Sequence, residues 1–452
     1  MGIKEILKFL LKTRHFVVFL AIVFLFSFGY SLVHQIKPAV DARAYEAIAR
    51  NLVEIGEYRL NLEGPLAEDH SIVKVGPGYE FFLAGIYSVF SQGHWIIWLS
   101  QSLMFILTLI LLGILIIKIF NREEKIEWKK FYFTIIPAAF FVDVIQLNAM
   151  LLGESLFIFL LSLALFIFYW NLERDDLRKV ISLGLIMGGL YLVRPVALVV
   201  LVIFLITFLL KKNYKNLVLV GLIFAVIQVP WVLRNYQVYD KVILTHTTAG
   251  GVDLLSGNYP GNHGEFRSDF ELYRQIEAES VTPIKFYESS SKWFFDFAKN
   301  NPLTLLLIWA EKGVIFWSMT KTGGFWFHYF NNYEQGATVL LSILSYILVF
   351  GTAIIYSLKV FREKFKDDLF LKGLVGSALL LMLVSVVTII SSRYRITLLP
   401  LALILSAGYW WRKSDFNYKY YLIAGGWLVA ATALDLWMQY DKFLQKIGLI
   451  LS

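Results

Sequence analysis

The sequence contains no cysteine, so disulfide bonds and thiolate chemistry are excluded. It is also poor in charge, because only 17% of its 452 residues are charged and 58% are hydrophobic, whereas a soluble domain has about 25% charged residues. The net charge of +8 falls mainly in short loops between apolar runs, which is typical of membrane orientation and gives no reason to expect a nucleic-acid partner. With a mean hydropathy of +0.63, the chain is predicted to be an all-α polytopic membrane protein.

Apolar runs recur along the chain, and a helix needs roughly 20 such residues to cross the hydrocarbon core. The runs lie at residues 16–33, 95–118, 131–150, 151–170, 180–193, 196–210, 216–233, 337–358, 370–390, 396–411 and 420–438. A further apolar segment, 303–320, is ambiguous, and we interpret it as an interfacial or partly inserted helix. The pattern predicts a bundle of about eleven to thirteen transmembrane helices.

Lysine and arginine favour the cytoplasmic side of a membrane. The basic N-terminus and the basic loops 118–130 and 359–366 are therefore expected inside, in a bacterial inner or plasma membrane. Loops 34–94 and 234–302 are then on the outer face, periplasmic or extracytoplasmic. Within the second of these loops, Ser268 to Glu271 has the form of a capping box, and Thr282 with Pro283 predicts another helix start.

This organisation predicts three parts of the chain. The first is an N-terminal transmembrane module, 1–233, which includes the first outer loop, 34–94. The second, 234–335, holds the outer loop and interfacial helices. The third, 336–452, holds the C-terminal transmembrane helices and the tail.

Two residues of the first outer loop have side chains suited to chemistry at the membrane surface. Asp41 begins a predicted helix that ends near Gly56, so it is either an N-cap, which Asp favours, or a base at a membrane-facing cleft. Lys74 precedes the turn Gly76-Pro77-Gly78 and is either a solvated loop lysine or an ammonium that binds a phosphate.

Four arginines occupy three predicted outer turns, against the general excess of positive charge inside. They are Arg194, Arg234, Arg393 and Arg395. Each alone is consistent with an interfacial anchor. Together with Lys74 they predict a phosphate site, because guanidinium groups bind phosphate bidentately.

Asp143 and Glu154 lie near the outer turn of the apolar hairpin 131–170. Charges at membrane depth are costly, so such residues normally have a partner or a function. We expect Glu154 either to pair with an arginine or to bind the sugar or the acceptor, and we place Asp143 in the same substrate-binding group.

Histidines 70, 94, 246, 263 and 328 fall in or near predicted outer segments, and none has HxxxH or HExxH spacing. We therefore predict no metal ligands and no cofactor. A structural zinc or another divalent ion, held by scattered His and Glu side chains that meet in space, is the alternative.

With these residues in view, the chain resembles the GT-C fold membrane glycosyltransferases, in particular the protein O-mannosyltransferases and their bacterial relatives that include the lipid A aminoarabinose transferase. Four stretches carry the resemblance: Asp41 with Tyr45 and the helix to Tyr58; Lys74 to Pro77-Gly78-Tyr79 and Gly85; Glu154 to Phe157 with Tyr191 to Pro195; and Pro230 to Asn235 with Arg393-Tyr394-Arg395. Together they cover most of the chain.

The resemblance implies transfer of a monosaccharide from a polyprenyl-phosphate donor, undecaprenyl phosphate in a bacterium, to a lipid, glycan or protein acceptor of the cell envelope, lipid A included. It implies that Asp41 is the catalytic base and that Lys74 contacts the donor phosphate. Tyr45 and Tyr79 are expected to contact the sugar. Two alternatives stay open: a flippase or transporter of lipid-linked sugars, and an oligosaccharide-lipid ligase or polymerase.

Overall fold

The computed structural model describes residues 2–73, 76–90, 92–121, 123, 125–173, 175–320, 331–362, 368–412 and 416–440, and all regular structure in them is helical. In a bilayer a helix satisfies every backbone polar group internally, which is why the apolar runs take this form. Seven helical segments are long and apolar enough to cross a membrane. They are α2 (Arg14–His34), α5 (His94–Phe120), α8 (Glu154–Glu173), α11 (Tyr214–Tyr239), the continuous α16 (Asn332–Tyr346), η3 (Ile347–Gly351) and α17 (Thr352–Arg362), α18 (Leu369–Val387) and α21 (Tyr418–Met438).

An eighth candidate span is broken. The predicted run 131–150 forms α6 (Trp128–Ala139) and α7 (Val142–Asn148), which meet at a bend of 50°. The bend follows Pro137, whose ring removes a backbone donor inside α6. The described residues therefore give seven candidate spans, or eight with this pair, in an integral membrane protein. This count is lower than the eleven to thirteen that the sequence predicts.

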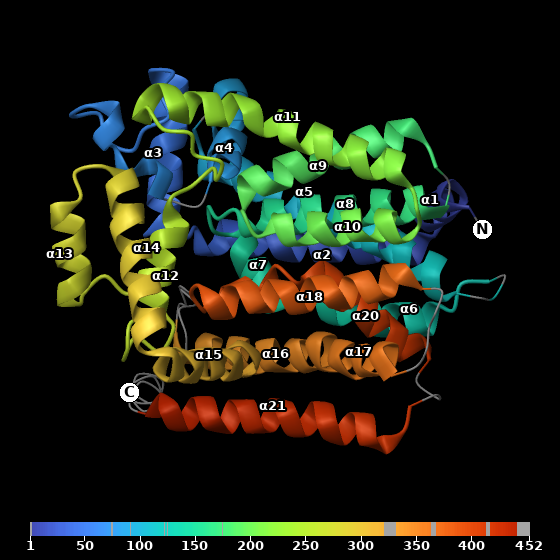
Figure 1. Cartoon of the computed structure of the whole chain (residues 1–452). Coiled ribbons are helices and arrows are strands. Elements are labelled where there is room, and N and C mark those ends of the chain that lie inside the picture. The colour runs from blue at the N-terminus through green and yellow to red at the C-terminus, as the bar shows by residue number, and fades with distance from the viewer. Residues whose placement is uncertain are drawn as a thin grey trace.

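The remaining apolar helices are too short to pass the same test. They are α9 (Leu177–Val193), α10 (Ala197–Leu210), α15 (Pro302–Trp317) and α20 (Leu399–Trp411). The ambiguous segment 303–320 thus forms α15, which packs along α18 and α21 within the bundle (Figure 1).

Short helices gather at one end of the bundle, and the N-terminus with α1 (Ile3–Lys12) lies at the other (Figure 1). The gathered helices are α3 (Asp41–Glu54), α4 (Pro77–Val89), α12 (Ala249–Asn258), α13 (Glu271–Glu279) and α14 (Pro283–Asn300), and the turns η1 (Leu66–Glu68) and η2 (His70–Val73) belong to the same loops. The helix α14 begins at Pro283 as predicted, and Thr282 caps it by accepting from the Lys285 amide. The capping box at Ser268 is wrong, because α13 begins after Phe270 without a side-chain cap.

Close packing of α9 on α11 fixes where the C-terminal end of α9 lies. A Cβ atom on Gly184 or Gly188 would come within 2.8 Å of Ile223 or Ile227, so only glycine fits at these two positions. Small residues four apart are a common way for membrane helices to approach closely. This contact positions α9, which ends at Val193, and so also positions Arg194, the C-cap residue that follows.

Candidate functional site

Asp41 is the first residue of α3, but it does not cap the helix. The N-cap position is Val40, and no side chain caps the end. Oδ2 of Asp41 instead accepts from Nη2 of Arg393 at 2.6 Å. Val40 has a φ of +48°, which is strained for a β-branched residue. Such strain is concentrated at functional sites in proteins, so Asp41 follows a turn that the surrounding structure must hold in place.

Arg393 joins Asp41 to a second carboxylate. It lies on α19 (Ser392–Ile396), and its Nε is 3.7 Å from Oε1 of Glu154. Glu154 has no exposed side-chain surface, and the same oxygen is 2.5 Å from Nη2 of Arg194. The four side chains form a series of alternating charge, Asp41–Arg393–Glu154–Arg194, which we call the ion-pair cluster. Buried charges persist only when they are paired, and here each one has an opposite neighbour.

A cavity lies on each side of this cluster. The Asp41 cavity, about 50 Å³, is lined by Asp41 and Arg393 together with residues 36–40, Ala42 and 150–152. The larger cavity, about 180 Å³, is lined at one end by Arg194, Asp253 and Tyr394. We call it the Asp253 cavity. Because Arg393 lines one cavity and its neighbour Tyr394 the other, α19 forms part of the wall between them.

The two tyrosines that the sequence assigns to the sugar pack beside the cluster. Tyr45 and Tyr79 are buried and meet edge to face, with ring centroids 5.7 Å apart. Burial raises the pKa of both phenols well above the usual value, and the Asp41 charge adds to this effect on Tyr45. They are therefore neutral hydrogen-bonding groups, and the Tyr79 hydroxyl donates to Gln101 at 2.9 Å.

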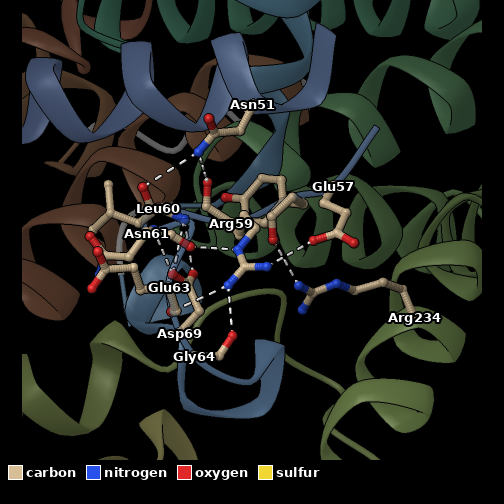
Figure 2. A network of polar contacts seen from close by, with 10 residues as sticks. Asn51, Glu57, Arg59, Leu60, Asn61, Glu63, Gly64, Asp69 and Arg234 are labelled. Atoms are coloured by element: carbon tan, nitrogen blue, oxygen red, sulfur yellow. Dashed lines mark hydrogen bonds and ion pairs between the residues drawn. The ribbon is translucent and has the colours of Figure 1, made fainter. Parts of the chain in front are cut away.

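Arg234 lies apart from the cluster, in a polar network with residues of the loop 34–94 (Figure 2). Its Nη2 donates to the Tyr58 carbonyl at 3.0 Å, and its guanidinium lies over the Tyr58, Trp231 and Tyr239 rings. Next to it, the Asp69 carboxylate accepts from the Leu60, Asn61 and Ser71 amides. Arg234 therefore holds the loop against the end of α11.

Arg395 and Asp143 also make contacts away from Asp41. Arg395 is 3% exposed, donates to the Phe316 and Ser318 carbonyls at the end of α15, and lies over the Tyr346 ring. The Asp143 carboxylate accepts from the Ser342 hydroxyl at 3.0 Å. The structure thus brings together Asp41, Arg393, Glu154 and Arg194 of the predicted set, with Tyr45 and Tyr79 beside them. Lys74 and His328 lie outside the described residues.

Three residues that the sequence did not single out for this site stand near it. Asp253, on α12, lines the larger cavity. Glu80 is fully buried, accepts from the Tyr58 hydroxyl at 3.2 Å, and has its pKa raised by burial to about 8. His246 is buried against the Tyr191 ring, and burial lowers its pKa to about 3. Nothing in the local sequence marks them, because their surroundings come from segments distant in the chain.

No group of three His, Asp or Glu side chains in the described ranges is close enough to hold a metal ion. Two of the histidines pair with carboxylates: His94 contacts Glu46 at 2.8 Å, and His263 contacts Glu311 at 2.5 Å. The His94 hydrogen bond, with burial opposing it, lowers the pKa of the Glu46 carboxyl.

No family model matches the sequence, and no curated protein matches it. In fold, the chain is similar to a crystal structure of ArnT from Cupriavidus metallidurans bound to undecaprenyl phosphate, with a TM-score of 0.52 and 13% identity over 97% of this chain and 74% of that chain. The apo structure of ArnT from the same organism gives a TM-score of 0.41 and 15% identity over 88% and 77% of the two chains. The first similarity shows that this chain has the fold of a GT-C lipid A aminoarabinose transferase, as the resemblance predicts.

Proposed function

We propose that this protein transfers a monosaccharide from a polyprenyl-phosphate donor to a lipid, glycan or protein acceptor at the outer face of the membrane. The observation that carries the proposal is the ion-pair cluster, where Asp41 and Arg393 face one cavity while Arg194 faces another. A transferase needs a base for the acceptor and positive charge for the leaving phosphate, side by side. The ArnT-like fold supports the same class of reaction.

In the proposed reaction, the acceptor hydroxyl attacks the anomeric carbon of the donor sugar in one inverting step. The bond from that carbon to the phosphate oxygen breaks, and the phosphate leaves with the electron pair. Asp41 takes the acceptor proton. A phosphate leaves without protonation, so positive charge at the developing anion contributes most, and Arg393 and Arg194 would supply it.

A departing phosphate would compete with Asp41 and Glu154 for these arginines. Lys74 is proposed to join them at the donor phosphate, as the resemblance implies. Arg234 and Arg395 are predicted in the same role, although in the described structure they contact backbone carbonyls and aromatic rings, and Arg234 also donates to the Asn235 side chain. Tyr45, Tyr79, Glu154 and Asp143 remain proposed substrate-binding residues.

The proposal includes the arrangement predicted from the sequence. It comprises a bundle of about eleven to thirteen spans, in which short helices complete the crossing, with divisions near residues 233 and 335. The N-terminus would be cytoplasmic and the ion-pair cluster extracytoplasmic.

The test uses purified protein in nanodiscs with radiolabelled undecaprenyl-phosphate monosaccharides. Wild type should release the lipid phosphate and move the label to an acceptor, and Asp41→Asn should not. Specific lipid binding with no turnover across several donors and acceptors would instead favour a flippase. Transfer of preassembled chains only would favour a ligase or polymerase.

A further inference from the structure

The lining of the Asp253 cavity includes both charged and apolar side chains. Arg194, Asp253 and Tyr394 stand at the charged end, and the wall includes Leu381 and Val384 of α18, a candidate membrane span. A ligand that fits both parts has an anionic head and a hydrocarbon tail. A donor of the proposed function, a phosphodiester attached to a polyprenyl chain, has this form.

Asp253 is the unusual group in such a cavity, because a carboxylate repels a phosphate. Its side chain makes no hydrogen bond or ion pair with any residue in the described part of the chain, and it faces the cavity. Arg194 at the same end is 7% exposed and pairs with Glu154. An anion that enters therefore meets Arg194 and a carboxyl group that has no hydrogen-bond or ion-pair partner among the described residues.

The charged and titratable groups around Asp253 come from several elements. They are Asp41 of α3, Arg194 after α9, Tyr273 of α13, Lys312 of α15, and Arg393 and Tyr394 of α19. Burial, with the Asp41 charge added, raises the pKa of Asp253 to about 7 against the opposing effect of Arg393, Lys312 and Arg194. Near neutral pH the carboxyl group is then divided between its two forms, and a bound phosphate would favour the neutral one.

We propose that the Asp253 cavity takes the phosphodiester of the donor, and that Asp253 binds it in the protonated form, donating a hydrogen bond while Arg194 supplies the charge. Donor binding is then coupled to the uptake of one proton by Asp253. This inference rests on the proposed function, because it assumes a lipid-phosphate donor, but it concerns binding alone and is tested without turnover.

The probe is the methyl ester of undecaprenyl phosphate, incorporated in nanodiscs with the full-length protein. A phosphodiester carries one charge across the whole range of interest, so any pH dependence belongs to the protein. If only the protonated protein binds, the apparent affinity falls about tenfold between pH 6 and pH 8, in proportion to the protonated fraction. Titration calorimetry in buffers of different ionisation enthalpy should show uptake of about three quarters of a proton at pH 7.5.

Asp253→Asn separates this role from a structural one. Its amide donates at every pH, so binding should match wild type at pH 6, lose its pH dependence and take up no proton. Asp253→Leu should bind weakly at all pH values. Asp269→Asn is the matched control, because Asp269 is an exposed acid of the same outer loop that pairs with Arg267, and it should keep the wild-type profile.

The cavity itself is tested by filling it. Val384 lines the cavity and is 37% exposed, so Val384→Trp should reduce the cavity volume, whereas Leu383, the neighbouring position, is 50% exposed and is not part of the cavity lining, so Leu383→Trp should not. Only the first should abolish binding. Two results would overturn the inference and leave the proposed function standing. One is an Asp253→Asn variant that binds as tightly as wild type and keeps the wild-type pH profile. The other is a Val384→Trp variant that binds as tightly as wild type. Absence of any binding by wild type would overturn both.

Discussion

The arginine pair Arg194 and Arg393 and the single arginine Arg234 lie at the same end of this protein, and their partners differ. Arg194 and Arg393 pair with Glu154 and Asp41 beside two cavities. Arg234 donates to a backbone carbonyl and is enclosed by three aromatic rings (Figure 2).

The two sites differ in whether a phosphate can replace the partner of the guanidinium. A carboxylate partner is itself an anion, so an incoming phosphate can take its place. A backbone carbonyl and stacked rings hold the arginine for packing, and losing them would release the loop around Tyr58 and Asp69. We infer from this comparison that the ion-pair cluster binds the substrate and that the Arg234 network stabilises the fold. The following predictions test it.

The largest effect is expected from Asp41→Asn, which removes the proposed base. Transfer from a radiolabelled lipid-phosphate sugar should fall about 10²- to 10⁴-fold, the usual range for a lost general base. Donor binding should change little at pH 6, which lies below the pKa of Asp253. Asp269→Asn provides the control, with transfer expected at the wild-type rate. Full activity in Asp41→Asn would remove this residue from the chemistry.

Arg194→Met should strongly destabilise the protein, because it leaves the buried Glu154 without its closest partner. Removing one member of a buried ion pair costs about 3–5 kcal/mol. Adding Glu154→Gln to the variant should recover most of the lost melting temperature in detergent. If the double variant is no more stable than Arg194→Met, the pair is not what holds Glu154.

Glu80 lies where the two regions meet, since it accepts from Tyr58 of the scaffold and follows Tyr79 of the site. Its pKa is about 8 in the fold and near its usual value when unfolded. Protonation is therefore favoured by folding, so its contribution to stability is fully present below the usual pKa and is lost as the pH rises to about 8.

Glu80→Gln removes that dependence. The variant should melt several degrees above wild type at pH 9, while the two melting temperatures should converge toward pH 4. Parallel melting curves for the two proteins across this range would show that Glu80 is not held in its neutral form. Glu279→Gln, an exposed acid, serves as the comparison.

The smallest effect is expected from Arg234→Lys. Lysine keeps the charge but loses the planar contact with the rings and part of the hydrogen bonding, which costs about 1 kcal/mol. The melting temperature should fall slightly while the KM for the donor stays within twofold of wild type. A higher donor KM with unchanged stability would make Arg234 a phosphate ligand, as the sequence predicts, and would break the comparison. Arg267→Lys controls for the substitution at an exposed site.

Much of the fold was predictable because apolar runs in a membrane have few alternatives to helices. The helix that begins at Asp41, the start of α14 at Pro283 and the runs around α5, α8 and α18 all follow the sequence. The bend after Pro137 and the missing cap at Ser268 did not follow it, because local patterns give the preference of a segment but not the packing that overrides it.

The sequence by itself determined that this is an all-helical membrane protein and that Asp41, Glu154, Arg194 and Arg393 lie at or next to helix ends, because hydropathy acts through local composition. Only the tertiary structure decided which charges meet. Asp41 and Arg393 are 352 positions apart, and Asp253 reaches the same site from α12, a helix with no motif. Coulomb pairing and burial depend on distance in space, and helix packing sets that distance.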